Sequence, residues 1–144
     1  MVSASPALPG LENPRLHHIA VVVADLDEAI TRYTRLGFGD AERFLLAEQA
    51  VEVATMRSGH GWVELIRPID ADGPIARYLA KRGEGLHHVA YAVPDLPAAL
   101  TRLAEVGLRL IDTVPRTGAH GWRIAFVHPE SCGGALTELV EASG

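Results

Sequence analysis

Apolar residues near the start of the chain follow a strand pattern first and a helical pattern next. Residues 21–23 are three valines, which are typical of a half-buried strand. Asp25 then predicts a helix N-cap, and Glu28 three residues later fits a capping box. Gly37 is placed to end the helix. Between these signals the apolar positions recur with helical spacing, at Leu26, Ala29, Ile30, Tyr33 and Leu36.

The same pattern returns later in the chain. Residues 17–38 and 87–108 are offset by 70 positions and are identical at ten of 22, including two adjacent histidines at the start. In the second copy Asp95 predicts the N-cap, Pro97 falls in the first helical turn and Gly107 ends the helix. Such identity indicates an internal duplication.

Three short strand candidates follow each helix. They are residues 42–46, 50–56 and 62–67 in the first half, and 109–114, 123–127 and 135–141 in the second. The expected fold class is α+β, with two tandem βαβββ modules that form one curved, cup-shaped sheet in a single domain, 15–144. The modules span about 15–67 and 86–142, and a short helical linker from Pro74 to Gly83 joins them. Because each half is small, we expect the modules to share a core around a common cavity.

Composition narrows the class of protein. The chain has 144 residues, of which 48% are hydrophobic and 22% charged, and a net charge of −5 that argues against nucleic-acid binding. The single cysteine, Cys132, indicates a reducing compartment, so we expect a cytoplasmic protein. No apolar run approaches the roughly 20 residues of a membrane span. Residues 1–14 carry three prolines among small residues and no secretory signal, and we interpret them as a flexible tail.

The duplication also repeats a carboxylate. Glu64 and Glu138 each lie in the middle of an apolar strand, where a glutamate is costly unless it faces solvent, is paired or binds a cation. Each module also offers two adjacent histidines on its first strand, 17–18 and 87–88. Neighbouring residues on a strand point to opposite faces, so alternation leaves open which histidine of each pair points inward. A structural histidine and a solvent-facing glutamate are the alternatives, but the duplicated set predicts a divalent-metal site.

The ligand types limit the metal and its chemistry. Two imidazoles and two carboxylates suit Co²⁺, Ni²⁺, Mn²⁺, Zn²⁺ or Fe²⁺, whereas structural zinc sites are more often rich in sulfur. Four protein ligands around an octahedral ion leave two positions for substrate oxygens. Such an ion is a Lewis acid that can stabilise an enolate, which forms when a proton is removed next to a carbonyl.

Two βαβββ modules that each carry a histidine and a glutamate resemble the vicinal oxygen chelate superfamily. Residues 81–88 and 123–139 are more specific, and they resemble the methylmalonyl-CoA epimerase family within it. The resemblance implies one divalent metal ion, with Co²⁺ favoured, and a homodimer that acts on an acyl-CoA. It also implies interconversion of the 2R and 2S forms of methylmalonyl-CoA, with Glu138 as both ligand and catalytic base. The implied metal ligands are His18, Glu64, His88 and Glu138.

The second acid or base of the resemblance falls on an altered position. Some family members carry a glutamate on the strand facing Glu138, and an ungapped alignment places it at Val53. Glu52 is one residue away and is our candidate if a bulge restores its direction, and Glu48 is the alternative. Arg116 and Arg123 are candidates to pair with a carboxylate or phosphate of the substrate, although either one can simply be exposed. His60 and His120, each followed by Gly-Trp, are interpreted as turn residues.

Two other functions remain open. A glyoxalase I-type lyase, which acts on a glutathione thiohemiacetal, has the same bacterial ligand set and similar proton-transfer chemistry. A non-catalytic small-molecule binding protein can have the same fold, but such proteins typically lack the four ligands.

Overall fold

Two antiparallel strands at the centre of the structure, β1 (Arg15–Val22) and β5 (Gly85–Val93), join two copies of one arrangement. The computed structural model describes residues 10–142. On one side β1 pairs in parallel with β4 (Gly61–Pro68), followed by β3 (Val51–Ser58) and β2 (Ala41–Leu46). On the other side β5 pairs in parallel with β8 (Thr137–Glu141), followed by β7 (Arg123–Val127) and β6 (Arg116–Thr117). The resulting eight-stranded sheet confirms the two-module fold.

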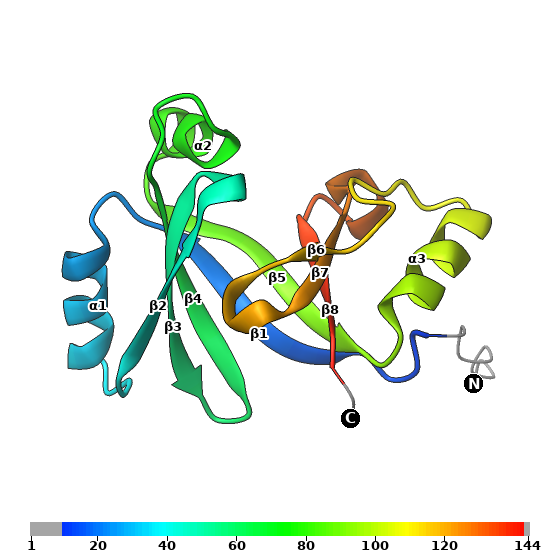
Figure 1. The fold of residues 1–144 in the computed structure, drawn as a ribbon, viewed down its shortest axis with the longest axis horizontal. Coiled ribbons are helices and arrows are strands. Elements are labelled where there is room, and N and C mark those ends of the chain that lie inside the picture. The colour runs from blue at the N-terminus through cyan, green and yellow to red at the C-terminus, as the bar shows by residue number, and fades with distance from the viewer. Residues whose placement is uncertain (1–9, 143–144) are drawn as a thin grey trace.

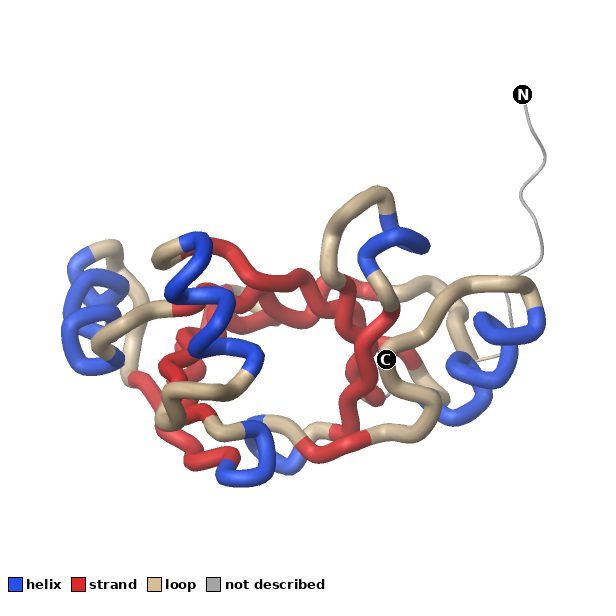
Figure 2. The backbone as a smooth tube through the Cα atoms, turned by 90° about the horizontal axis from the view of Figure 1, so that it is seen from above, coloured by secondary structure: helices blue, strands red, loops and turns tan. Residues whose placement is uncertain are grey.

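The sheet curves around an open interior, and helices α1 (Leu26–Arg35) and α3 (Leu96–Glu105) lie on its outside (Figures 1 and 2). Helix α1 packs against the first arm and α3 against the second, while α2 (Pro74–Arg82) is the predicted linker helix. Three short 3₁₀ turns, η1 (Ala47–Gln49), η2 (Ala119–Gly121) and η3 (Pro129–Cys132), interrupt the connections between strands. No helix within residues 10–142 is long and apolar enough to cross a membrane.

The predicted caps form in both copies. The carboxylates of Asp25 and Asp95 accept hydrogen bonds from the backbone N–H of Glu28 and Ala98, at 3.0 and 3.1 Å. Gly107 follows α3 with a positive φ of 91°, a conformation that favours glycine. The capping box does not close, because the Glu28 carboxylate pairs with Arg32 one turn later.

One strand prediction, residues 109–114, is wrong. Only Leu110 forms an isolated bridge, to Val127 on β7, and regular pairing begins at β6. The Asp112 carboxylate accepts the Phe126 N–H at 2.9 Å, so a side chain takes the donor that a neighbouring strand's carbonyl would use. Pro115 has no N–H to donate to a ladder. These two residues explain why the second module has a shorter edge.

The two modules share part of their core, as expected: Ala20, Val51, Val53 and Ile66 of the first module form one apolar cluster with Ala119 and Trp122 of the second. Each helix buries its own apolar cluster: Leu26 and Ala29 of α1 pack with β3 and β4, and Leu96 and Leu100 of α3 pack with β5, β7 and β8. The inner face of the sheet holds the shared cluster, and several of the same residues also line a cavity between the modules.

Only the last part of the predicted flexible tail, 1–14, belongs to the described residues. Residues 1–9 lie outside the described residues. Gly10 is buried, and a Cβ there would come within 2.6 Å of Asp95 O and Ala99 N, so this glycine allows the backbone to pack against the start of α3.

Candidate active site

Four adjacent strands place the duplicated histidines and glutamates on one face. In the register, His18 of β1 lies beside Ala90 of β5, which lies beside Glu138 of β8. Two residues along, Glu64 of β4 lies beside Ala20 of β1, which lies beside His88 of β5. The alanines are fully buried and fill little space, so the four longer side chains converge above them.

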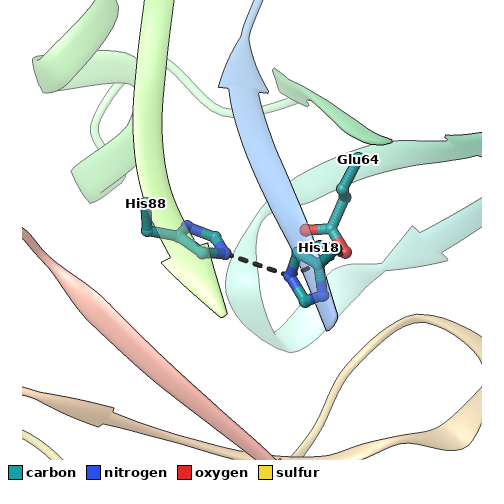
Figure 3. Close-up of side chains that lie close together, drawn as sticks. All are labelled: His18, Glu64 and His88. Atoms are coloured by element: carbon teal, nitrogen blue, oxygen red, sulfur yellow. Dashed lines mark hydrogen bonds and ion pairs between the residues drawn. The ribbon is translucent and has the colours of Figure 1, made fainter. Parts of the chain in front are cut away.

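The structure resolves which histidine of each pair faces inward. His18 and His88 are 2% and 4% exposed, and their Nε2 atoms lie 3.4 Å apart. Figure 3 shows these two rings and Glu64 pointing toward one another from three neighbouring strands. His18 Nε2 is 3.8 Å from Glu64 Oε2 and 3.2 Å from Glu138 Oε1, and His88 Nε2 is 3.3 Å from Glu138 Oε2.

This cluster fits a divalent cation. The ligand atoms of His18, Glu64 and His88 all lie within 4.8 Å of one another, close enough to surround one ion. Glu138 Oε1 is buried and makes no hydrogen bond of good geometry, although His18 Nε2 is near. A buried carboxylate oxygen without a donor is costly, and a cation between the four side chains would satisfy it.

A cavity of about 390 Å³ opens above the cluster. Its walls come from both arms of the sheet and are mostly apolar, with Val51, Val53, Ile66, Trp122, Ile124 and Phe126 among the lining residues. Glu64, His88 and Glu138 also line it, so a bound molecule can reach the polar cluster. An apolar cavity with a few convergent polar groups is typical of a small-molecule site.

Comparison with known proteins identifies the family. The model of the glyoxalase/bleomycin resistance protein/dioxygenase superfamily matches residues 17–126. The chain is 38% identical over 130 residues to the mitochondrial methylmalonyl-CoA epimerase of Bos taurus, covering 89% of this chain and 74% of the relative. It is 36% identical over 128 residues to the ethylmalonyl-CoA/methylmalonyl-CoA epimerase of Cereibacter sphaeroides, covering 87% and 96%. The chain belongs to the methylmalonyl-CoA epimerase family of this superfamily.

A solved structure supports the same family. A methylmalonyl-CoA epimerase in complex with methylmalonyl-CoA and NH₄⁺ superposes with a TM-score of 0.83 at 34% identity, covering 91% of this chain and 96% of that one. The fold and the cavity of this chain can therefore be compared with those of an epimerase whose solved structure contains an acyl-CoA.

The two inner carboxylates have opposite environments in this epimerase-family site. Burial raises the pKa of Glu64 above its usual value. Burial also acts to raise the pKa of Glu138, but the imidazoles of His18 and His88 outweigh it and lower that pKa well below the usual range. For His18, burial acts to lower the pKa, while Glu138 and Glu64 outweigh it and raise the pKa above 6.5. Glu138 is thus the carboxylate held ionised.

The outer histidines of the two pairs, His17 and His87, have similar pKa values, but only one of them lines the cavity. Burial and the neighbouring His18 lower the pKa of His17 to about 4, and burial and His88 do the same for His87. Both outer rings are neutral at physiological pH. Only His87 is among the residues that line the cavity.

Glu52, our candidate for the second acid or base, does not reach the site. Its carboxylate lies away from the cavity, 3.4 Å from Arg43 and 3.5 Å from Arg67 on neighbouring strands. Regular pairing of β3 with β2 and β4 leaves no bulge to turn it, and Val53 faces the cavity instead. Glu48, on η1 at the cavity wall, is the third carboxylate among the lining residues.

The two candidate arginines separate. Arg116 lines the cavity, where Asp112 holds its guanidinium at 2.9–3.2 Å and the group lies 5.4 Å from the centre of the Phe126 ring. Arg123 is absent from the cavity lining and pairs with Glu141 at 3.0 Å. Only Arg116 is placed to meet an anionic group of a bound molecule.

His120 does more than form a turn. It lies in η2 with a φ of +57°, and its Nε2 is 2.7 Å from the hydroxyl of the fully buried Thr55 of the first module. Its ring also packs against Trp62 and Trp122. His60 lies in the exposed turn between β3 and β4. Each histidine precedes Gly-Trp, but their offset of 60 residues differs from the duplication offset, which is the signal that their roles differ.

Proposed function

We propose that this protein interconverts the 2R and 2S forms of methylmalonyl-CoA by moving the proton at C2. The observation that carries the proposal is the buried His18–Glu64–His88–Glu138 cluster at the base of the cavity, in a chain that belongs to the epimerase family. When bound there, a divalent cation supplies a Lewis acid that stabilises negative charge on a substrate oxygen. Co²⁺ is our preferred metal because the family resemblance favours it, although two imidazoles and two carboxylates also suit Ni²⁺, Mn²⁺, Zn²⁺ and Fe²⁺.

Glu138 is the proposed base. It is ionised, it lines the cavity, and the imidazoles on either side orient its carboxylate. An oxygen of this carboxylate takes the C2 proton from one face of the substrate and returns it in the reverse direction. The apolar walls limit direct contact of C2 with bulk water, so solvent protons reach this carbon through the carboxylates.

Glu48 is the proposed acid for the opposite face. It belongs to the β2–β3 connection, whereas Glu138 lies on β8 in the other arm, so the two carboxylates reach the cavity from different modules. Epimerisation requires a proton to leave one face and return to the other. Glu48 is the remaining candidate, because Val53, where the alignment places the family's glutamate, has no proton to give, and the Glu52 carboxylate faces away from the cavity.

Arg116 is the proposed contact for an anionic oxygen of the acyl-CoA. Its Nε and Nη2 bind Asp112, which leaves the other edge of the guanidinium for a ligand.

A homodimer and a cytoplasmic location belong to the proposal as well. Leu16 and Tyr91, register partners on the two central strands, are exposed and support a contact between two copies.

Deuterium incorporation at C2 of methylmalonyl-CoA in heavy water tests this function. The protein is assayed after chelation and again after Co²⁺ is restored, and the non-enzymatic rate is subtracted. We expect exchange above background only with the metal. Absence of exchange with Co²⁺ present would rule out the epimerase, and conversion of methylglyoxal and glutathione by the same sample would identify a lyase instead.

A further inference from the structure

Each inner histidine is in contact with the histidine that precedes it in the chain. His17 Nδ1 lies 2.8 Å from His18 Nδ1, and His87 Nδ1 lies 2.9 Å from His88 Nδ1. The two contacts are 70 residues apart and involve the same atoms. The β1 strand has an irregular register between Leu16 and His18, which changes the simple alternation of side chains at this point.

The tautomers of the four rings follow from the position of the cluster. His18 and His88 turn their Nε2 atoms toward each other and toward the carboxylates, so a cation there would take the Nε2 lone pair. A neutral imidazole that uses Nε2 as a ligand carries its proton on Nδ1. That Nδ1–H then donates to Nδ1 of the preceding histidine, which accepts it and keeps its own proton on Nε2.

We propose that His17 and His87 are positioning residues that orient the metal-binding rings of His18 and His88 by accepting their Nδ1–H. A partner on the far nitrogen of a ligand imidazole fixes the tautomer, holds the ring plane and raises the basicity of the metal-binding nitrogen. The role rests on the proposed metal site and is independent of the reaction carried out there.

The surroundings of the two outer rings indicate that His17 and His87 do more than fill space. Trp122, from the second module, lies edge-on to His17 with ring centres 4.5 Å apart, whereas Tyr78 of α2 lies edge-on to His87 at 4.9 Å. The aromatic neighbours therefore differ in residue type and in the element that supplies them. The shared feature of the two sites is the Nδ1–Nδ1 contact, which indicates that the hydrogen bond is the property kept in both copies.

Two substitutions at one position test the role. His17→Phe keeps an aromatic ring against Trp122 but has no acceptor, whereas His17→Asn loses the ring but keeps an oxygen at the δ position. Co²⁺ dissociation constants are measured by competition with a chelator, together with the Co²⁺ absorption spectrum. We expect the phenylalanine variant to bind Co²⁺ roughly 10–100-fold more weakly, and the asparagine variant to stay closer to the unaltered protein.

The opposite order, weak binding by His17→Asn and unchanged binding by His17→Phe, would show that the ring only packs and would overturn the proposal. Equal binding by both variants and the unaltered protein would overturn it too.

The same pair of substitutions at His87 gives a second test if a His17 variant does not fold. Unfolding of the metal-free protein reports whether each variant is folded. His60→Asn, in an exposed turn, is the control and should not change the dissociation constant. Failure of the unaltered protein to bind Co²⁺ would refute the metal site itself, whereas binding without C2 exchange would refute only the epimerase function.

Discussion

At the scale of single residues, two alanines decide where the reactive groups meet. Ala20 separates Glu64 from His88 across the sheet, and Ala90 separates His18 from Glu138. Both alanines are fully buried, so a larger side chain at either position would fill the space in which the four groups converge. The site therefore depends on small residues as much as on its polar ones.

Glu138 and Glu52 give the sharpest contrast between two single carboxylates. Glu138→Gln removes the proposed base, so C2 deuterium exchange should fall roughly 10²–10⁴-fold while the fold is kept. Glu52→Gln changes a carboxylate that faces Arg43 and Arg67, and exchange should stay close to that of the unaltered protein. Near-normal exchange in Glu138→Gln would contradict the role assigned to it.

Acid sensitivity is expected from the outer histidines. The pKa of His17 falls from 6.5 to about 4 on folding, mainly through burial, so between these values the unfolded chain binds a proton that the folded chain does not. His17 should therefore lower the free energy of unfolding of the metal-free protein as the pH falls from 6.5 to about 4. His17→Phe lacks the group and should lose less stability than the unaltered protein over the same window. Denaturant unfolding at several pH values checks this, and parallel losses would contradict it.

At the scale of secondary-structure elements, the two helix caps are equivalent by sequence but not by environment. The α3 N-terminus has a second acceptor, because Glu141 Oε2 takes the Leu96 N–H at 2.9 Å. At α1, Glu84 takes the N–H of Ala24, which precedes the cap. The duplicated helices thus start in the same way but are tied to different parts of the chain.

Asp25→Ala and Asp95→Ala should each lower the free energy of unfolding by about 1 kcal/mol, because each removes the acceptor for one first-turn N–H. Replacement of either aspartate by serine keeps an acceptor and should restore most of the loss. Urea unfolding of the four variants measures this. Equal destabilisation by alanine and serine would show that the carboxylates act through charge and not as caps.

At the scale of the whole molecule, the site exists only where the two modules meet. His18 and Glu64 come from the first module and His88 and Glu138 from the second. The hydrogen bond between Thr55 and His120, at 2.7 Å, and the one from the Gln49 side chain to Thr117 O, at 2.8 Å, also connect the two modules around the cavity. Metal binding should therefore stabilise the arrangement of the modules as well as each strand.

Metal removal tests this coupling. Co²⁺ at a hundredfold excess over its dissociation constant should raise the free energy of unfolding by about 2.7 kcal/mol relative to the chelated protein. His18→Ala and His88→Ala should each largely remove this gain, since each takes a ligand from a different module. Thermal or denaturant unfolding with and without Co²⁺ measures it. A gain that persists in both variants would place the ion elsewhere.

Local signals were sufficient for most elements. The aspartate caps and the glycines after the helices mark α1 and α3, and the 70-residue offset between two copies shows the duplication. The strand predicted at 109–114 failed because the Asp112 side chain takes a ladder donor and Pro115 cannot supply one. Side-chain competition of this kind depends on which backbone comes near, so periodicity does not reveal it.

The amino-acid pattern was sufficient to predict the two-module fold, because duplication repeats the apolar pattern, and the family resemblance added the set of four ligand candidates. Tertiary structure decided the inward direction of His18 and His88, the outward direction of Glu52 and the place of Arg116 at the cavity. The physical reason is that direction on a strand depends on register and bulges, which are set by pairing between segments far apart in the chain. The contacts of the outer histidines arise in the same way, from how the strands and their neighbours pack.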